Sequence, residues 1–161
     1  MAPSQGFIHG EIGRLIARLA RIWRRESDQA LSDHCLSYAT AIPLLVLSRQ
    51  GENVRQGVLA DELGIEGPSL VRLIDLLQAE GLVERREDPT DRRAKTLHLT
   101  KAGEAKVEET NRVLRRVRAS LLKDIAPEEL AITFETLQRI ERRASRLHEA
   151  KTLAKTFPEA Q

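Results

Sequence analysis

Residues 57–99, GVLADELGIEGPSLVRLIDLLQAEGLVERREDPTDRRAKTLHL, decide the fold of this chain. Their first half predicts two short helices, one over about 55–63 and one from residue 67 up to Gly81. Gly64 suits the left-handed cap that ends a helix, and Pro68 is tolerated in the first turn of the next. The second helix carries apolar residues at i, i+3, i+4 and i+7: Leu70, Leu73, Ile74 and Leu77. A tight turn therefore joins two amphipathic helices.

The second half of the stretch predicts a two-stranded β-hairpin over 82–86 and 95–99. We expect the residues of each strand to alternate between the two faces of the hairpin. A charged, proline-containing turn, residues 87–93, connects the strands and ends in Arg92 and Arg93. Two helices joined by a short turn and followed by a hairpin with a basic tip are typical of a winged helix-turn-helix.

Long amphipathic helices are predicted on both sides of this unit. The first spans about 7–31, and the second is capped by Ser37 and ends near residue 50. Pro43 lies inside that second helix, where we expect a kink or a later helix start. Beyond the hairpin, Thr100 caps a long helix reaching Ile125, and another begins at Pro127.

The composition agrees with a helical fold and excludes several other classes. Of the 161 residues 41% are hydrophobic and only 3% aromatic, which argues against an all-β domain. No apolar run is long enough to span a membrane. The single cysteine, Cys35, permits no internal disulfide and fits a reducing compartment. We therefore expect a soluble cytoplasmic protein, mainly α with a small β-hairpin wing.

The sequence holds no convincing catalytic or metal site. The four histidines, His9, His34, His98 and His148, are scattered without ligand spacing, and paired acids occur at helix starts or on solvated faces. We expect no enzyme activity, no metal and no cofactor. Cys35 beside His34 raises a redox or nucleophile hypothesis, since an imidazolium lowers a thiol pKa, but an inert thiol is the favoured interpretation.

Basic residues are arranged in the hairpin unit as a DNA reader would need them, although the net charge of +2 is uninformative. The second helix of the pair presents Ser69 and Arg72 outward. The major groove of DNA is wide enough to admit one helix, so these two side chains would face the base edges. Guanidinium groups at the hairpin tip suit a minor groove. Further phosphate-facing charge is expected from Arg85, Arg86, Lys95 and Lys101.

Residues 56–103 closely resemble the DNA-binding domain of the MarR family of bacterial transcription regulators, in particular its SlyA-like branch. The resemblance rests on GPSLVRLIDLL (67–77), AEGLVERR (79–86), DPTDRRAK (88–95) and LTKAG (99–103), in the family's order and spacing. RIWRR at residues 21–25 is similar to the family's first helix. Gly67 departs from the glutamine that the SlyA-like pattern often has there, which puts the operator preference at that step in doubt.

The resemblance implies a homodimer that reads a roughly palindromic double-stranded operator, more often as a repressor. Residues 1–36 and 101–161 would form the dimerisation region, and 37–100 the DNA-binding domain. Half-sites would lie about 34–36 Å apart. The implied recognition-helix residues are Pro68, Ser69 and Arg72, and the implied wing residues are Asp91, Arg92, Arg93 and Lys95, with Asp91 holding a wing arginine by an ion pair.

The family often binds small aromatic carboxylates between the dimer helices and the winged domain. Trp23 is a weak candidate for such a ligand site, since simple packing also explains it. A protein-interaction module that has lost DNA binding is the alternative function, and Gly67 is its only support in the sequence.

Overall fold

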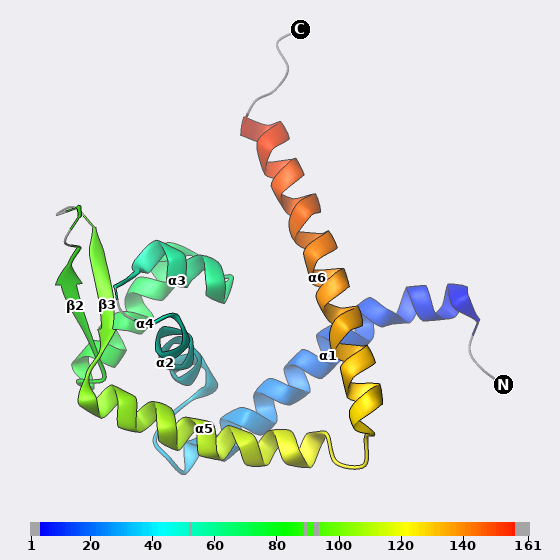
Figure 1. The fold of residues 1–161 in the computed structure, drawn as a ribbon, viewed down its shortest axis with the longest axis horizontal. Helices are drawn as coiled ribbons and strands as arrows, with labels where there is room; N and C mark the ends of the chain where they lie inside the picture. The colour runs from blue at the N-terminus through cyan, green and yellow to red at the C-terminus, as the bar shows by residue number, and fades with distance from the viewer. Residues whose placement is uncertain (1–3, 52, 89, 92–93, 157–161) are drawn as a thin grey trace, which may run out of the picture. The chain divides into compact units, whose positions relative to one another are not determined.

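The computed structural model describes residues 4–51, 53–88, 90–91 and 94–156, with side chains up to residue 148 (Figure 1). The described elements are α1 (Gln5–Ser32), α2 (Tyr38–Gln50), β1 (Val54–Arg55), α3 (Gln56–Leu63), α4 (Gly67–Ala79), β2 (Val83–Glu87), β3 (Lys95–Leu99), α5 (Lys101–Leu121) and α6 (Pro127–Thr156). The chain forms two compact units, Met1–Leu121 and Leu122–Gln161. A mainly helical fold with a small β wing is confirmed.

Helix α2 begins where the sequence predicts and runs through its proline without a break. The Ser37 hydroxyl accepts a hydrogen bond from the Thr40 amide (3.2 Å), and the Ser37 amide donates to the Thr40 hydroxyl (3.1 Å), forming a capping box. Of the two alternatives predicted at Pro43, a kink or a later helix start, the later start is therefore wrong. The proline ring is buried in the core, and this apolar burial offsets the helical hydrogen bond that the ring removes.

The wing contains a strand that the sequence did not predict. The sheet order is β1-β3-β2, with Val54 opposite Leu97 and Arg55 opposite Thr96. Strand β3 is therefore central. Its consecutive residues Thr96, Leu97 and His98 are all buried, instead of alternating between buried and exposed, because both faces of the strand are covered. The polar groups among them are satisfied, since the Thr96 hydroxyl and His98 Nε2 lie 2.9 Å apart in a hydrogen bond.

The core of the first unit is built chiefly from leucines of α1, α2, α3, α4 and the sheet. Its fully buried members include Leu31, Ala41, Leu44, Leu59, Leu70, Ile74, Leu77 and Leu97. The C-terminal half of α1 packs on α2 and α5, whereas its N-terminal half is exposed. The winged unit is thus packed into one core with α5 and the end of α1.

The start of α5 is fixed tightly to the turn before β2. The Thr100 hydroxyl accepts a hydrogen bond from the Gly103 amide (3.0 Å) and donates one to the Gly81 carbonyl (2.6 Å). This confirms Thr100 as the cap. The helix ends at Leu121, short of the predicted Ile125, and Asp124 adopts a left-handed conformation (φ 65°) in the following turn.

The second unit consists of α6, whose apolar side chains are exposed. Ile132 and Phe134 are more than 60% exposed, and Leu137, Ile140 and Leu147 are exposed as well. None of the described helices, this one included, is long and apolar enough to cross a membrane.

Candidate nucleic-acid interface

Helix α4 has one buried and one open face, as the apolar spacing predicts. Leu70, Ile74 and Leu77 are fully buried, whereas Ser69 and Arg72 are exposed on the outward side. In the described part of the chain, the Arg72 guanidinium makes no hydrogen bond and no ion pair. An extended cation is therefore available to an external anion or base edge.

The turn between α3 and α4 sets the angle of this face. Gly64 adopts the left-handed conformation (φ 62°), and the Ile65 amide donates back to the Ala60 carbonyl (3.1 Å). Pro68 follows in the first turn of α4, where its missing N–H removes no helical bond. The three residues 64–66 thus reverse the chain, and the predicted helix-turn-helix is confirmed.

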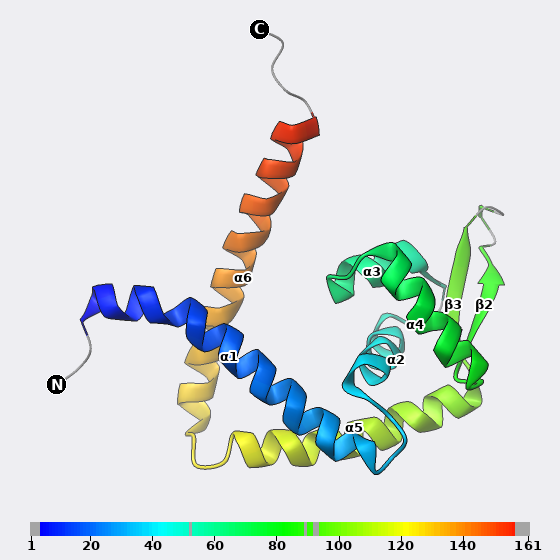
Figure 2. The ribbon, with the colours of Figure 1, turned by 180° about the vertical axis from the view of Figure 1, so that it is seen from behind.

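The strands of the wing hold their basic side chains against acidic partners. Arg85 Nη1 lies 2.6 Å from Asp75 Oδ1 and 2.9 Å from Gln78 Oε1, both on α4, which packs beside β2 (Figure 2). Arg85 therefore fastens the wing to α4 instead of facing phosphate as the sequence suggested. Arg86 pairs with Glu84, and the Lys95 ammonium lies 3.3 Å from Glu87.

An ion pair that the sequence did not predict joins the wing turn to the start of α3. Arg55 Nε lies 2.6 Å from Asp88 Oδ2, and Asp88 is only 7% exposed. Hydrogen bonds from Thr90 and from Arg55 hold the pKa of the Asp88 carboxyl well below its usual range. The carboxylate is therefore charged at any physiological pH and requires its cationic partner.

Two of the predicted wing residues, Arg92 and Arg93, lie outside the described residues. Asp91 is placed in the turn by its backbone: its amide lies 3.2 Å from Asp88 Oδ1, and its carbonyl accepts from Ala94 (2.9 Å). The predicted ion pair between Asp91 and a wing arginine stays a prediction.

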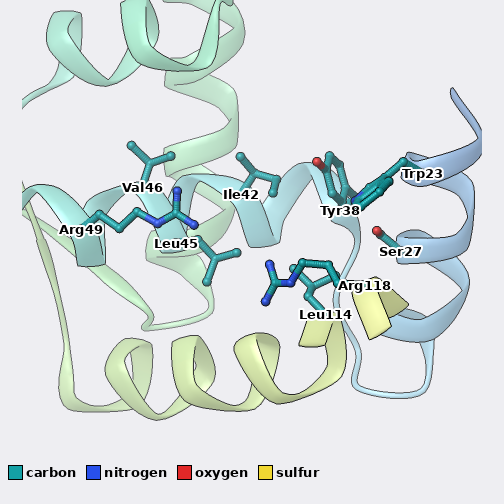
Figure 3. A pocket seen from close by; sticks show the side chains of 9 residues that line it. All are labelled: Trp23, Ser27, Tyr38, Ile42, Leu45, Val46, Arg49, Leu114 and Arg118. Atoms are coloured by element: carbon teal, nitrogen blue, oxygen red, sulfur yellow. The ribbon is translucent and has the colours of Figure 1, made fainter. Parts of the chain in front are cut away.

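Trp23 lines a cavity of about 220 Å³ between α1, α2 and α5 (Figure 3). Its ring lies beside Tyr38, and the guanidinium groups of Arg49 and Arg118 reach into the space between α2 and α5. The Ser27 hydroxyl at its edge is fully buried and has no hydrogen-bond partner in the described structure. A buried polar group without a partner favours any occupant that can supply one.

The loop before α2 is tied to α5 through His34. His34 Nδ1 lies 2.7 Å from Glu109 Oε1, and the Lys106 ammonium binds the other oxygen of the same carboxylate (2.9 Å). The ammonium and the imidazole lower the pKa of the Glu109 carboxyl. Cys35 is exposed beside this cluster. Within the described residues, no three metal-binding side chains gather around a common point.

Comparison with known proteins agrees with this geometry. The model of the MarR family matches residues 36–94. The crystal structure of the transcriptional regulator PA3341 has a TM-score of 0.78 at 36% identity, covering 84% of this chain and 98% of that one. This chain belongs to the MarR family.

Two further MarR structures share the fold. A MarR-family regulator from Rhodococcus sp. RHA1 is 25% identical, with a TM-score of 0.74 over 86% of this chain and 96% of that one. A mutant of MarR from E. coli, solved in complex with operator DNA, is 24% identical, with a TM-score of 0.75 over 85% and 99%. The winged-helix architecture of a MarR regulator is thus shown across nearly the whole length of its relatives.

Proposed function

We propose that this MarR-family protein is a homodimeric repressor that binds a pseudo-palindromic operator through α4 and the wing. The observation that carries the proposal is Arg72, which is exposed on the outward face of α4 and unpaired among the described residues. The wing-strand cations Arg85, Arg86 and Lys95, in contrast, each have an acidic partner. That E. coli MarR was solved with operator DNA supports the same docking for this fold.

The outward face of α4 matches what a major groove requires. The helix has 13 residues and is therefore about 20 Å long, and a groove about 12 Å wide admits its N-terminal part. Pro68 and Ser69 would approach the backbone or base edges first, and Arg72 follows one turn later. Arg72 can fork onto a guanine or grip a phosphate.

Exposed apolar side chains support a dimer. On α1 they form a continuous face, of which Phe7 and Leu19 are more than half exposed. Apolar side chains of α6 are likewise exposed, and such a surface on a single chain is a candidate for burial against a second copy. We assign residues 1–36 and 101–161 to dimerisation and 37–100 to DNA binding.

Fluorescence anisotropy with duplexes from the upstream region of the protein's own gene tests the proposal. We expect tight, palindrome-dependent binding with a steep salt dependence. Arg72→Ala should weaken operator binding by about 1–3 kcal/mol per half-site if its guanidinium binds a base. Arg115→Ala removes an exposed arginine of α5, outside α4 and the wing, and should leave affinity unchanged in a variant that size-exclusion chromatography shows to be as dimeric as the wild type. Equal, weak binding to every duplex would favour the protein-interaction module instead.

The sign of regulation needs a separate experiment. In vitro transcription from a promoter that carries the operator should fall as protein is added. A rise in transcript with specific binding intact would make the protein an activator.

We further propose that a small aromatic carboxylate occupies the cavity beside Trp23 and weakens DNA binding. A volume of about 220 Å³ suits a single ring, which Trp23 and Tyr38 can flank, while Arg118 or Arg49 binds the carboxylate. The cavity joins α1 and α5 to α2, so an occupant can favour one placement of the winged unit over another.

Calorimetric titration with salicylate tests this part independently of DNA. We expect heat with the wild type and a markedly weaker response in Arg118→Ala. Ser27→Ala removes the unpartnered hydroxyl and shows whether that group binds the ligand. Absence of heat, together with unchanged DNA affinity in salicylate, would remove the ligand proposal and leave the DNA-binding one intact.

A further inference from the structure

We propose that Arg55 is a positioning residue for DNA reading: by binding Asp88 it fixes the wing turn to the N-terminus of α3. The inference rests on the proposed function. It concerns an ion pair between residues 33 positions apart in the sequence: Arg55 at the end of β1, and Asp88 in the wing turn directly after β2.

Arg55 spans the gap between the two elements with two hydrogen bonds. Its Nε lies 2.6 Å from Asp88 Oδ2, and its Nη2 donates to the Thr90 hydroxyl (3.2 Å). The guanidinium thus holds two residues of the turn at once, one by charge and one by a neutral hydrogen bond. The planar guanidinium presents these two donors in a fixed geometry, whereas the ammonium of a lysine is a compact point charge on a flexible stem and does not reproduce that geometry.

Asp88 organises the turn from inside. Its Oδ1 accepts hydrogen bonds from the Thr90 amide (2.8 Å), the Thr90 hydroxyl (2.6 Å) and the Asp91 amide (3.2 Å). The Asp88 amide donates a hydrogen bond to the Ala94 carbonyl (3.2 Å), and this bond joins the two ends of the turn. One buried carboxylate therefore shapes the turn with one oxygen and binds Arg55 with the other.

Arg55 lies at a position where the side chain usually caps a helix, but it binds the wing turn instead. Arg55 occupies the N-cap of α3, where serine, threonine or aspartate would bind a free amide of the helix. Among the described residues, no side chain caps α3. The residue at this position forgoes capping and instead connects α3 to the wing.

The charge of Asp88 allows a test in which a structural role and a purely electrostatic role change operator affinity in opposite directions. Asp88 carries a negative charge near the proposed DNA surface, so its neutralisation would by charge alone strengthen DNA binding. If Asp88 and Arg55 hold the wing turn, neutralisation weakens binding instead. A direct phosphate contact by Arg55 predicts the opposite result, because Asp88→Asn would release its guanidinium to the DNA.

The experiment compares Arg55→Met, Asp88→Asn, the double variant and Arg55→Lys in the full-length protein. Methionine keeps the apolar stem, and asparagine keeps one oxygen for the turn amides. Amide hydrogen exchange at Thr90 and Asp91, measured without DNA, reports the turn directly. Anisotropy with the operator duplex reports DNA reading.

We expect exchange at Thr90 and Asp91 to speed up on the order of tenfold in both single variants, with the helices unchanged. Operator affinity should fall on the order of tenfold in each, and the double variant should be no weaker than the worse single one, because both act through one ion pair. Arg55→Lys should lie between Arg55→Met and the wild type.

Three results would overturn the inference: unchanged exchange in Arg55→Met, tighter operator binding by Asp88→Asn, or fully additive losses in the double variant. Failure of the wild type to bind any duplex would instead overturn the proposed function and, with it, the role of Arg55 in reading DNA. The exchange measurement would then still decide whether Arg55 holds the turn, so the two failures are distinguishable.

Discussion

Replacing Gly103 by alanine should destabilise the winged unit, because α5 begins in direct contact with the backbone before β2. A Cβ atom at Gly103 would lie 2.0 Å from the Leu82 carbonyl oxygen, 3.1 Å from its carbon and 3.3 Å from Leu99 Cδ2. Ordinary contact begins at 3.4 Å, so α5 or the Leu82 peptide must move by 3.4 − 2.0 = 1.4 Å.

The cost follows from what that movement breaks. The Leu82 carbonyl accepts the Thr100 amide at 3.1 Å, and a shift of this size loses the bond, at about 1 kcal/mol. Overpacking adds about 1–3 kcal/mol. Alanine regains about 1 kcal/mol over glycine in a helix. The net loss in the free energy of unfolding should be about 1–3 kcal/mol.

Urea unfolding followed by circular dichroism measures this loss, at equal protein concentrations because a dimer's stability depends on concentration. Gly57→Ala is the matched control: its helical Cβ would meet no atom within 4 Å, and it should be neutral or stabilise by up to about 1 kcal/mol. If Gly103→Ala proved as stable as Gly57→Ala, the close approach of α5 to Leu82 would not exist in solution.

Three other perturbations have defined outcomes. Leu44→Ala removes a fully buried side chain and should lower the free energy of unfolding by about 2–5 kcal/mol in the same urea assay. Ser37→Ala should cost about 1 kcal/mol, since the Thr40 amide loses its acceptor; an unchanged midpoint would contradict the capping box. The folded-state pKa of Asp88 is lowered, so its contribution is complete above its ordinary pKa of 3.8 and lost as pH falls below it. Acid titration should therefore show the stability gap between wild type and Asp88→Asn closing below that pH, and a constant gap would refute this role of the ion pair.

The fold was largely predictable because its signals are local. Ser37, Thr100 and Gly64 each act on residues within a few positions, and each lies at the helix end that its chemistry predicts. Strand β1 was missed because two residues, Val54 and Arg55, cannot display an alternating pattern. Only pairing with a strand more than 40 positions away makes them a strand.

The site was predictable where it depends on one helix and not where it depends on distant partners. Arg72 follows from the period of α4 alone. Arg85 was assigned to phosphate because the sequence does not reveal that Asp75 lies within 2.6 Å of it across the fold. The Ser27 hydroxyl could not be found either, since burial without a partner is a property of three packed helices.

The open face of α4 has an evolutionary consequence. Ser69 and Arg72 support no part of the core, so substitutions there alter what is read without a penalty in folding. Gly103 and Leu70, in contrast, are constrained by the atoms packed around them. Descendants of one ancestral regulator can therefore acquire new target sequences by a few exchanges on this surface while the scaffold beneath it is inherited almost unchanged.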